Sequence, residues 1–321
     1  MAKIPTFTEV SIPALGDLLY LVDISDTTDD ATGSSRKITL QRLLGMTPLT
    51  PGGRLTLFTG SPVSGNITAI STVYYTPYVH DRITLWDGTR WLSISFTEVS
   101  VAIGTVTSLL PHDVFGYLSG SSLLIEKLAW TNSTTRATGI SLQDGRYCKT
   151  GDKTRLYLGT FAALTTTQSE FSVLNRLVWN MYNRVWCNFL VHDSTDSWAY
   201  STAAFRSMNN STLNRVGLIR GLNDEPVSLQ HIVMLNAPNT TAGCVGIGLD
   251  SVTVNSANRF GTQALGSTFV NTMCEYVGTP GLGYHYLQCL EYGTGSATNT
   301  WYGDAGAPTV YRFGATGGGW F

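Results

Sequence analysis

The stretch DRITLWDGTRWLSISF, residues 81–96, decides the fold class, because two runs of alternating residues flank an Asp-Gly pair. Asp87-Gly88 is typical of a two-residue β-hairpin turn, since a type I′ turn needs positive φ at both central positions. With that pair at the tip, the predicted cross-strand partners are Ile83 with Leu92 and Leu85 with Arg90.

This register gives the hairpin two different faces. The first is apolar and is predicted to be core: Ile83, Leu85, Leu92 and Ile94. The second is mixed: Arg82, Thr84, Trp86, Trp91 and Ser93. A tryptophan on a mixed face is either covered by a loop or buried in an interface, so Trp86 and Trp91 are candidates for a glycan or subunit contact. A longer turn would shift the register and exchange the two faces.

Strand and turn signals continue along the whole chain. Helical periodicity is scarce, and short runs rich in Tyr, Trp, Thr and Val recur between Gly, Asn, Asp and Pro clusters. Residues 112–130 and 140–161 are predicted to form strands joined by tight turns, the latter at Asp144-Gly145 and Gly151-Asp152. For residues 164–186 strands are favoured over a helix, although Ser169 is suited to cap one.

We therefore predict an all-β protein. An N-terminal extended arm with a short helix occupies residues 1–50, followed by two β-sandwich, jelly-roll-like domains at 51–165 and 166–321. A length of 321 residues agrees with two domains plus a small extra module.

The charge balance argues against several functions. Only 13% of residues are charged and the net charge is −2, so there is no basic footprint for nucleic acid.

The opening MAKIPTFTEVSIPALG has no apolar core of a signal peptide, and no apolar run of membrane-spanning length is present, so we expect neither secretion nor membrane insertion. The five cysteines are widely spaced and are predicted to be buried free thiols.

No catalytic, cofactor or metal site is predicted. The five histidines have no partner at ligand spacing, and adjacent strand residues point to opposite faces. A glycan hydrolase would need two facing carboxylates. The loop carboxylates are each explained more simply as turn residues: Asp144, Asp152, Asp193, Asp196, Glu225 and Asp304.

The stretch YLVDISDTTDDATGSSRKITLQRLLG, residues 20–45, is polar and acidic, unlike the rest of the chain. Thr39 is predicted to cap a short helix over 40–45, whose leucines share one face. A helix of this length is unstable alone, so residues 1–50 are expected to fold against another surface. The residues predicted to attach this arm are Asp23, Asp26, Arg36, Lys37, Leu40, Leu43 and Leu44.

Two motif sets carry a family resemblance. The pattern D-x-S-D-T-T, A-T-G, K-I-T-L and L-L within residues 20–45 resembles the N-terminal segment of structural proteins of tailed bacteriophages. The succession YYTPY, WDGT, DVF, WTN, RAT and YLGT, up to residue 161, resembles a β module of phage virion proteins. The C-terminal half, with WYGD and GATGGGWF, is similar more loosely.

The resemblance implies a virion appendage or decoration protein that is commonly a homotrimer. From the residues themselves we expect assembly in the host cytoplasm and no enzymatic activity. The first hypothesis is a short trimeric tail fibre or receptor-binding appendage, held to tail, collar or capsid proteins through its arm. The alternatives are a capsid cement protein and a tail-associated glycan hydrolase. Host-surface glycan is the expected external ligand.

The C-terminal half offers aromatic residues for that ligand. The candidates for a glycan contact are Trp198, Tyr200, Trp301 and Tyr302, with core or subunit-interface positions as the alternative. The closing Trp320 and Phe321 are expected to reach a neighbour's groove, because two such aromatics rarely stay in water without reason.

Overall fold

The computed structural model describes residues 18–39, 49–238, 242–261, 263–264, 268–295 and 297–321. The predicted all-β class is confirmed: the described chain is built from strands, and its one helical segment is the 3-10 turn η1, Met208–Asn210. The predicted helix over 40–45, with Leu40, Leu43 and Leu44, lies outside the described residues.

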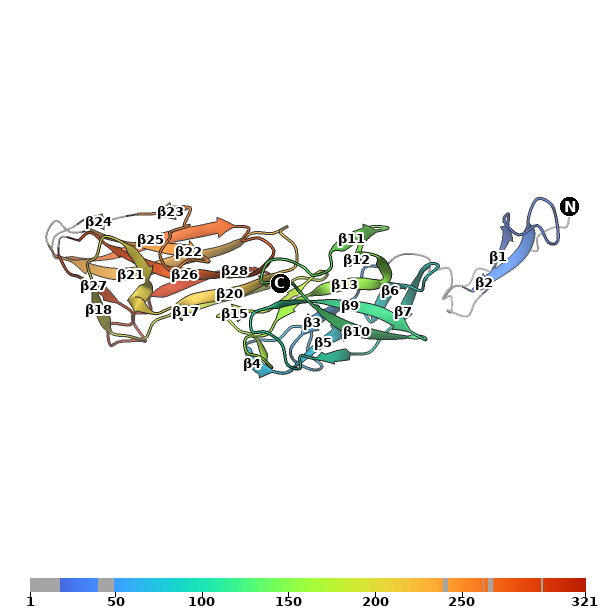
Figure 1. The fold of residues 1–321 in the computed structure, drawn as a ribbon, viewed down its shortest axis with the longest axis horizontal. Helices are drawn as coiled ribbons and strands as arrows, with labels where there is room; N and C mark the ends of the chain where they lie inside the picture. Colours follow the sequence, from blue (N-terminus) through green and yellow to red (C-terminus); the bar gives the residue numbers. More distant parts are fainter. Residues whose placement is uncertain (1–17, 40–48, 239–241, 262, 265–267, 296) are drawn as a thin grey trace.

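The first half of the chain holds three sheets that pack around one core (Figure 1). A three-stranded sheet has the order β3 (Gly53–Thr56), β5 (Thr72–Pro77), β8 (Val99–Ala102). A hairpin joins β6 (Arg82–Trp86) and β7 (Trp91–Ser95). A larger sheet has the order β10 (Ser122–Ala129), β9 (Pro111–Ser119), β13 (Asp152–Ala162), β12 (Arg146–Lys149), β11 (Ile140–Gln143), with β16 (Val178–Asn180) on β13.

The second half is dominated by two larger sheets. One has the order β24 (Gln263–Ala264), β22 (Ala242–Leu249), β26 (Gly283–Gly293), β20 (Arg215–Arg220), β15 (Asn175–Arg176), β14 (Ser169–Phe171), β4 (Ile67–Ile70), with β19 (Phe205–Ser207) on β26. The other, here called the seven-stranded sheet, has the order β17 (Trp186–His192), β28 (Gly314–Trp320), β21 (Val227–Ala237), β25 (Thr268–Gly278), β23 (Arg259–Phe260), while β27 (Asn299–Tyr302) pairs with β21 and β18 (Ser197–Tyr200).

Strands on either side of residue 165 serve both halves. β4 lies before residue 165 yet pairs with β14 of the second half, and β16 follows residue 165 yet pairs with β13 of the first half. Residues 169–192 are strands and turns, so the preference for strand over helix in this segment is confirmed. The division into domains at 165 stays a prediction.

The β6–β7 hairpin forms, but its tip is one residue later than predicted. The Asp87 N–H donates to the Arg90 carbonyl at 3.0 Å, so Gly88 and Thr89 are the turn residues. The Asp87 carboxylate accepts the backbone N–H groups of Thr89 and Arg90, both at 2.8 Å. Asp87 therefore caps the turn from its flank, and Gly88, with φ of 103°, takes the left-handed position.

This correction changes the pairs but not the faces of the hairpin. The observed partners are Trp86 with Trp91, Leu85 with Leu92 and Ile83 with Ile94. A shift of two residues leaves each side chain on its predicted side, because the period of a strand is two. Ile83 and Leu85 are accordingly fully buried in the core.

The turn predicted at Asp144-Gly145 is confirmed, with φ of 50° and 79°. It joins β11 to β12, and Gly151, with φ of 84°, lies in the turn before β13. All five cysteines are buried and unpaired, as predicted.

Candidate interaction sites

The arm contains a β-hairpin formed by β1 (Leu18–Asp23) and β2 (Ser34–Thr39). It belongs to neither half of the body and stands apart from both (Figure 1). Its acidic loop is more ordered than the composition suggested. Arg36 Nε donates to Asp26 at 2.8 Å and Arg36 Nη1 donates to Asp29 at 2.6 Å. Asp23, Asp26 and Asp30 each accept the N–H two residues later, so the aspartates hold turns.

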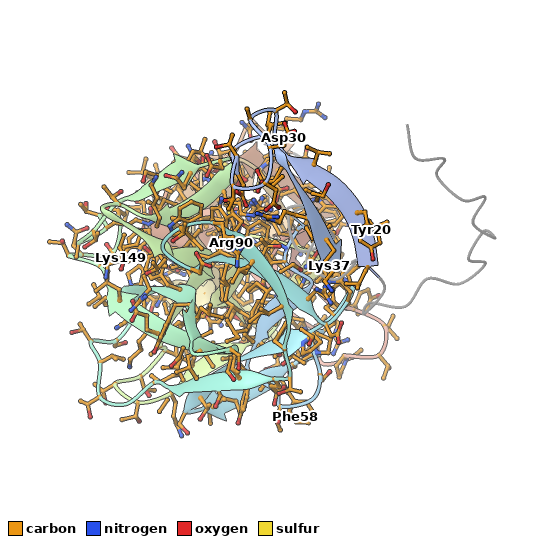
Figure 2. The ribbon with its side chains drawn as sticks, turned by 90° about the vertical axis from the view of Figure 1, so that its right-hand side faces the viewer. Tyr20, Asp30, Lys37, Phe58, Arg90 and Lys149 are labelled. Carbon is orange, nitrogen blue, oxygen red and sulfur yellow. The ribbon has the colours of Figure 1, made fainter. Side chains whose placement is uncertain are left out.

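The strands of this hairpin expose apolar side chains on both faces. The exposed fractions on and next to β1 are Leu18 45%, Leu19 44%, Tyr20 81%, Leu21 40%, Val22 61% and Ile24 80%. Figure 2 shows Tyr20 and Lys37, which are cross-strand partners, on this ribbon. An isolated two-stranded sheet is marginal in water, so these side chains need a further surface.

The predicted attachment residues therefore divide into two groups. Asp23, Asp26 and Arg36 organise the loop, because their charged groups already have partners within the hairpin. Lys37 and the apolar residues of β1 are exposed to solvent. Leu19, Leu21 and Ile24 were not among the predicted attachment residues. They belong to an apolar run, but the interpretation of this segment relied on the acidic loop that follows it.

The arm loop is expected to lose its order in acid. Hydrogen bonds from Thr28 and then Arg36 lower the pKa of Asp26 from 3.8 to about 2. A carboxyl with a lowered folded-state pKa stabilises the fold above its ordinary pKa and loses that effect as pH falls through the folded value. We expect the backbone amide resonances of Thr28 and Ser34 to keep their positions at pH 5 and to move to random-coil values near pH 2. Amide resonances of β20, Arg215–Arg220, in the body are the internal reference.

The mixed face of the β6–β7 hairpin is covered in part by the turn between β11 and β12. Trp91 Nε1 donates to Asp144 at 3.0 Å, and the Arg146 guanidinium lies 4.9 Å from the Trp91 ring centroid. Trp86 and Trp91 meet edge to face at 5.6 Å, with Lys153 Nζ 5.6 Å from the Trp86 ring. Both indoles are half-buried, so the loop-covered alternative describes them best.

Two open clefts are lined by residues of the first half of the chain, one of them together with Tyr182. The one beside Asp144 has a volume of about 270 Å³ and is lined by Thr50, Pro51, Asp144, Gly145, Arg146 and Tyr182. The other, of about 350 Å³, is rich in hydroxyl groups and is lined by Asp81, Ser95, Phe96, Thr97, Val99, Ser121, Ser122 and Leu123. Carboxylate, guanidinium and hydroxyl groups in an open cleft suit a polyhydroxy ligand. The sequence-based candidates for a glycan contact included Trp86 and Trp91 of this half, but the two clefts were not predicted.

Two of the C-terminal aromatic candidates, Trp198 and Trp301, face inward. Trp301 is fully buried and donates to the Tyr200 carbonyl at 3.2 Å. Trp198 Nε1 donates to the buried Glu291 at 2.6 Å. Burial raises the pKa of Glu291, and Arg206 forms an ion pair with it at 2.7 Å. The core alternative is therefore correct for Trp301.

Tyr200 and Tyr302 lie nearer the surface. The Tyr200 hydroxyl donates to the Ala204 carbonyl at 2.8 Å, and Arg206 lies 3.8 Å from its ring centroid. Tyr302 is half-buried and meets Phe269 at 5.6 Å. Tyr302 is opposite the half-buried Met234 of β21 in the register, on the outer side of the seven-stranded sheet.

The closing aromatics divide between the surface and the core. Trp320 is 44% exposed and meets Trp186 edge to face at 5.9 Å. Phe321 is fully buried between Phe171 and Phe189, at 6.3 and 5.9 Å. The expectation that Phe321 reaches a neighbour is thus corrected, because its ring completes the core of its own chain.

The loop carboxylates hold local structure, as predicted. Asp152 accepts from Thr154, Asp304 accepts from the Gly306 N–H, and Glu225 pairs with Arg184 at 3.0 Å. Asp193 accepts from Asn214 at 2.6 Å. Within the residues that the structure covers, no group of three or more His, Cys, Asp or Glu side chains is placed to hold a metal ion. In the same residues no helix has the length and apolar character needed to cross a bilayer.

Comparisons with known proteins do not assign a family. No protein-family model and no curated protein matches the chain. Among solved structures, the insecticidal delta-endotoxin Cry8Ea1 of Bacillus thuringiensis aligns with a TM-score of 0.22 and 8% identity, covering 95% of this chain and 59% of that one. A Bacillus thuringiensis Cry1Da tryptic core variant aligns with a TM-score of 0.18 and 9% identity, covering 90% and 58%. The chain thus spans under two thirds of these toxins, and likeness at this level carries no argument about fold or function.

Proposed function

We propose that this chain is a non-enzymatic structural protein of a tailed-phage virion, a short receptor-binding appendage anchored through residues 1–50. The observation that carries the proposal is the arm hairpin, whose apolar side chains are exposed on both faces. Its ion pairs and hydrogen bonds, among the described residues, stay inside residues 18–39. Such a hairpin needs a partner surface, and assembly into a particle supplies one.

The body supports an outward-facing role. It is weakly charged, its core extends through both halves, and its turns carry the two open clefts. These clefts are the proposed places for a host-surface glycan. The association in threes implied by the resemblance stays a prediction.

The experiment is deletion of residues 1–45. The shortened protein should fold with a melting temperature within about 2 °C of the full chain, since the arm contributes no bond to the body in the described residues, while incorporation into particles is lost. Thermal melting and co-sedimentation with particles measure the two effects. Loss of folding would contradict the arm assignment.

The destination of the arm separates this proposal from its alternatives. Binding of the full chain to host cells supports the appendage, and binding to undecorated heads supports capsid cement. In both binding measurements the variant Leu142→Glu, changed at a 62% exposed site on β11 of the body, should behave as the unchanged protein does. Release of reducing sugar from host polysaccharide, abolished by one Asp→Asn change, would establish a hydrolase instead.

A further inference from the structure

The outer face of the seven-stranded sheet is unusually apolar. On β17, β21 and β25 buried and exposed residues alternate, so one set of side chains points away from the core. We call this set the outer face. Its large apolar members and their exposed fractions are Trp186 49%, Leu190 41%, Trp320 44%, Phe269 61%, Met273 50% and Val277 46%. They come from three strands that the register places in one surface.

The outer face carries little charge. Among the outward residues of β17, β28, β21 and β25, Glu275 is the one acidic residue, and neither Lys nor Arg occurs. Glu275 lies 3.9 Å from Arg259 of β23. Depletion of charge with exposed Trp, Phe and Met is the composition of a protein–protein interface core.

The relief of the outer face differs on the two sides of β21. On the β28 side Gly314 and Thr316 are small, whereas the Trp186 indole covers Gly318, where an added Cβ would lie 2.5 Å from it. On the β25 side the surface is raised by Met273 and Val277, which face Ile232 and Ser228 of β21 across the register.

We propose that this face packs against the same face of a second copy, related by a two-fold axis parallel to β21. That rotation lays β25 of each copy over β28 of the other, because both strands are neighbours of β21. The register then brings Val277 over the indole at Gly318, Glu275 over Thr316 and Met273 over Gly314. Apolar side chains of β25 then meet the indole and the small residues beside it in both directions, as a two-fold contact requires.

The available area fits a contact between copies. Large side chains of about 150–250 Å² that are half exposed contribute on the order of 600 Å² over six residues. The half-buried Ile232, Met234 and Tyr302 and the polar residues between them bring this near the roughly 800 Å² per partner of a standard interface. A partner surface must therefore be apolar and of this size, and the outer face of a second copy meets both conditions.

This inference does not depend on the proposed function. The outer face and the arm are separate surfaces, so deletion of residues 1–45 tests the function without touching the sheet. A two-fold contact pairs copies and does not by itself close a ring of three.

The test is the mass of the full chain in solution, measured by light scattering and sedimentation over a range of concentrations. The wild-type protein is expected to contain two chains, or an even multiple. Met273→Glu places an unpaired carboxylate in the contact and should raise the dissociation constant at least about tenfold. Leu142→Glu is the matched control and should leave the mass unchanged, and thermal melting verifies that both variants fold.

A monomeric wild-type protein, a three-chain assembly that Met273→Glu leaves intact, or binding of a glycan or another phage protein to a monomer through this face would overturn the proposal.

Discussion

Phe321→Ala is expected to lower the free energy of unfolding by about 3–5 kcal/mol, the usual cost of removing a buried phenylalanine ring. Phe321 is fully buried and its ring contacts Phe171 and Phe189 edge to face. The Arg220 guanidinium lies 5.1 Å from the centroid of the same ring. Truncation leaves a cavity lined by side chains from three separate strands, so the site has little freedom to collapse.

Backbone contacts of Phe321 explain why this position reports on both halves of the chain. Its N–H donates to the Val185 carbonyl at 3.0 Å and its carbonyl accepts the Val185 N–H at 2.9 Å. Arg54, from β3 of the first half, donates to the same carbonyl at 3.1 Å. The substitution keeps these backbone hydrogen bonds, so the decrease in the free energy of unfolding reports the contribution of the Phe321 ring alone.

Chemical denaturation of Phe321→Ala and of Trp320→Ala provides the comparison. Trp320 is the neighbouring residue but is 44% exposed, so its truncation should cost about 2 kcal/mol, less than that of the fully buried Phe321. Equal effects of the two changes would show that the Phe321 ring does not fill the core.

Arg136→Met is expected to destabilise the protein by about 3–5 kcal/mol at neutral pH, because it leaves a buried carboxylate without its cation. Arg136 Nε donates to Asp113 at 2.7 Å, and the two side chains are 10% and 1% exposed. Arg136 Nη2 also donates to the Gly221 carbonyl at 2.6 Å, so the same side chain holds the loop after β20.

The surroundings of Asp113 account for the size of this effect. Thr160 donates to the carboxylate at 2.7 Å, and the Arg136 guanidinium lies 4.5 Å from the Trp130 ring centroid. Asp113 is buried, and this burial raises its pKa although Arg136 opposes the shift. Removing the guanidinium removes that opposition and raises the pKa further.

The pH dependence of Arg136→Met follows from this shift. A carboxyl whose folded-state pKa is above its ordinary value binds its proton more tightly when folded, so stability falls as pH rises from 3.8 through the folded value. The deficit of the variant relative to wild type should therefore be smallest near pH 4 and largest near pH 8. Urea unfolding at several pH values measures it.

The double variant Asp113→Asn with Arg136→Met is the control. It removes both charges and should recover more than half of the loss, because an uncharged pair leaves no ion stranded in the core. A deficit that is independent of pH, or no recovery in the double variant, would contradict the role assigned to the pair.

Strand alternation and turn residues were sufficient to predict the fold class from the sequence. Asp144 and Gly145 take left-handed φ values as an Asp-Gly turn predicts, and Ile83 and Leu85 are buried as their alternation predicts. Asp87-Gly88 was misplaced because aspartate can also cap a turn from its flank. Local sequence does not distinguish these two uses of the same dipeptide.

Two strands of the seven-stranded sheet have no clear strand signal in the sequence, for opposite reasons. β25 alternates in burial but not in polarity, because Phe269, Met273 and Val277 point outward. β28 is built around Gly317, Gly318 and Gly319, which look like a flexible tail. Its conformation comes from hydrogen bonds to β17 and β21, which are long-range partners.

The site residues were harder to predict than the fold. Trp301 and Trp198 looked suitable for a sugar, but burial depends on which strands pair, and β18–β27 pairing turns Trp301 inward. The two clefts combine residues far apart in sequence, such as Asp81 with Ser121 and Thr50 with Tyr182. No spacing rule reveals such combinations.

The position of β28 in the middle of its sheet has a consequence for synthesis. On the ribosome, residues 186–192 and 227–237 emerge well before residues 314–320, which bridge them. Until then β17 and β21 each present an unpaired row of backbone groups beside exposed Trp186, the pattern that promotes aggregation. A chain that stops before Gly314–Trp320 therefore leaves these two strand edges unpaired, and synthesis of β28 is needed to close the sheet.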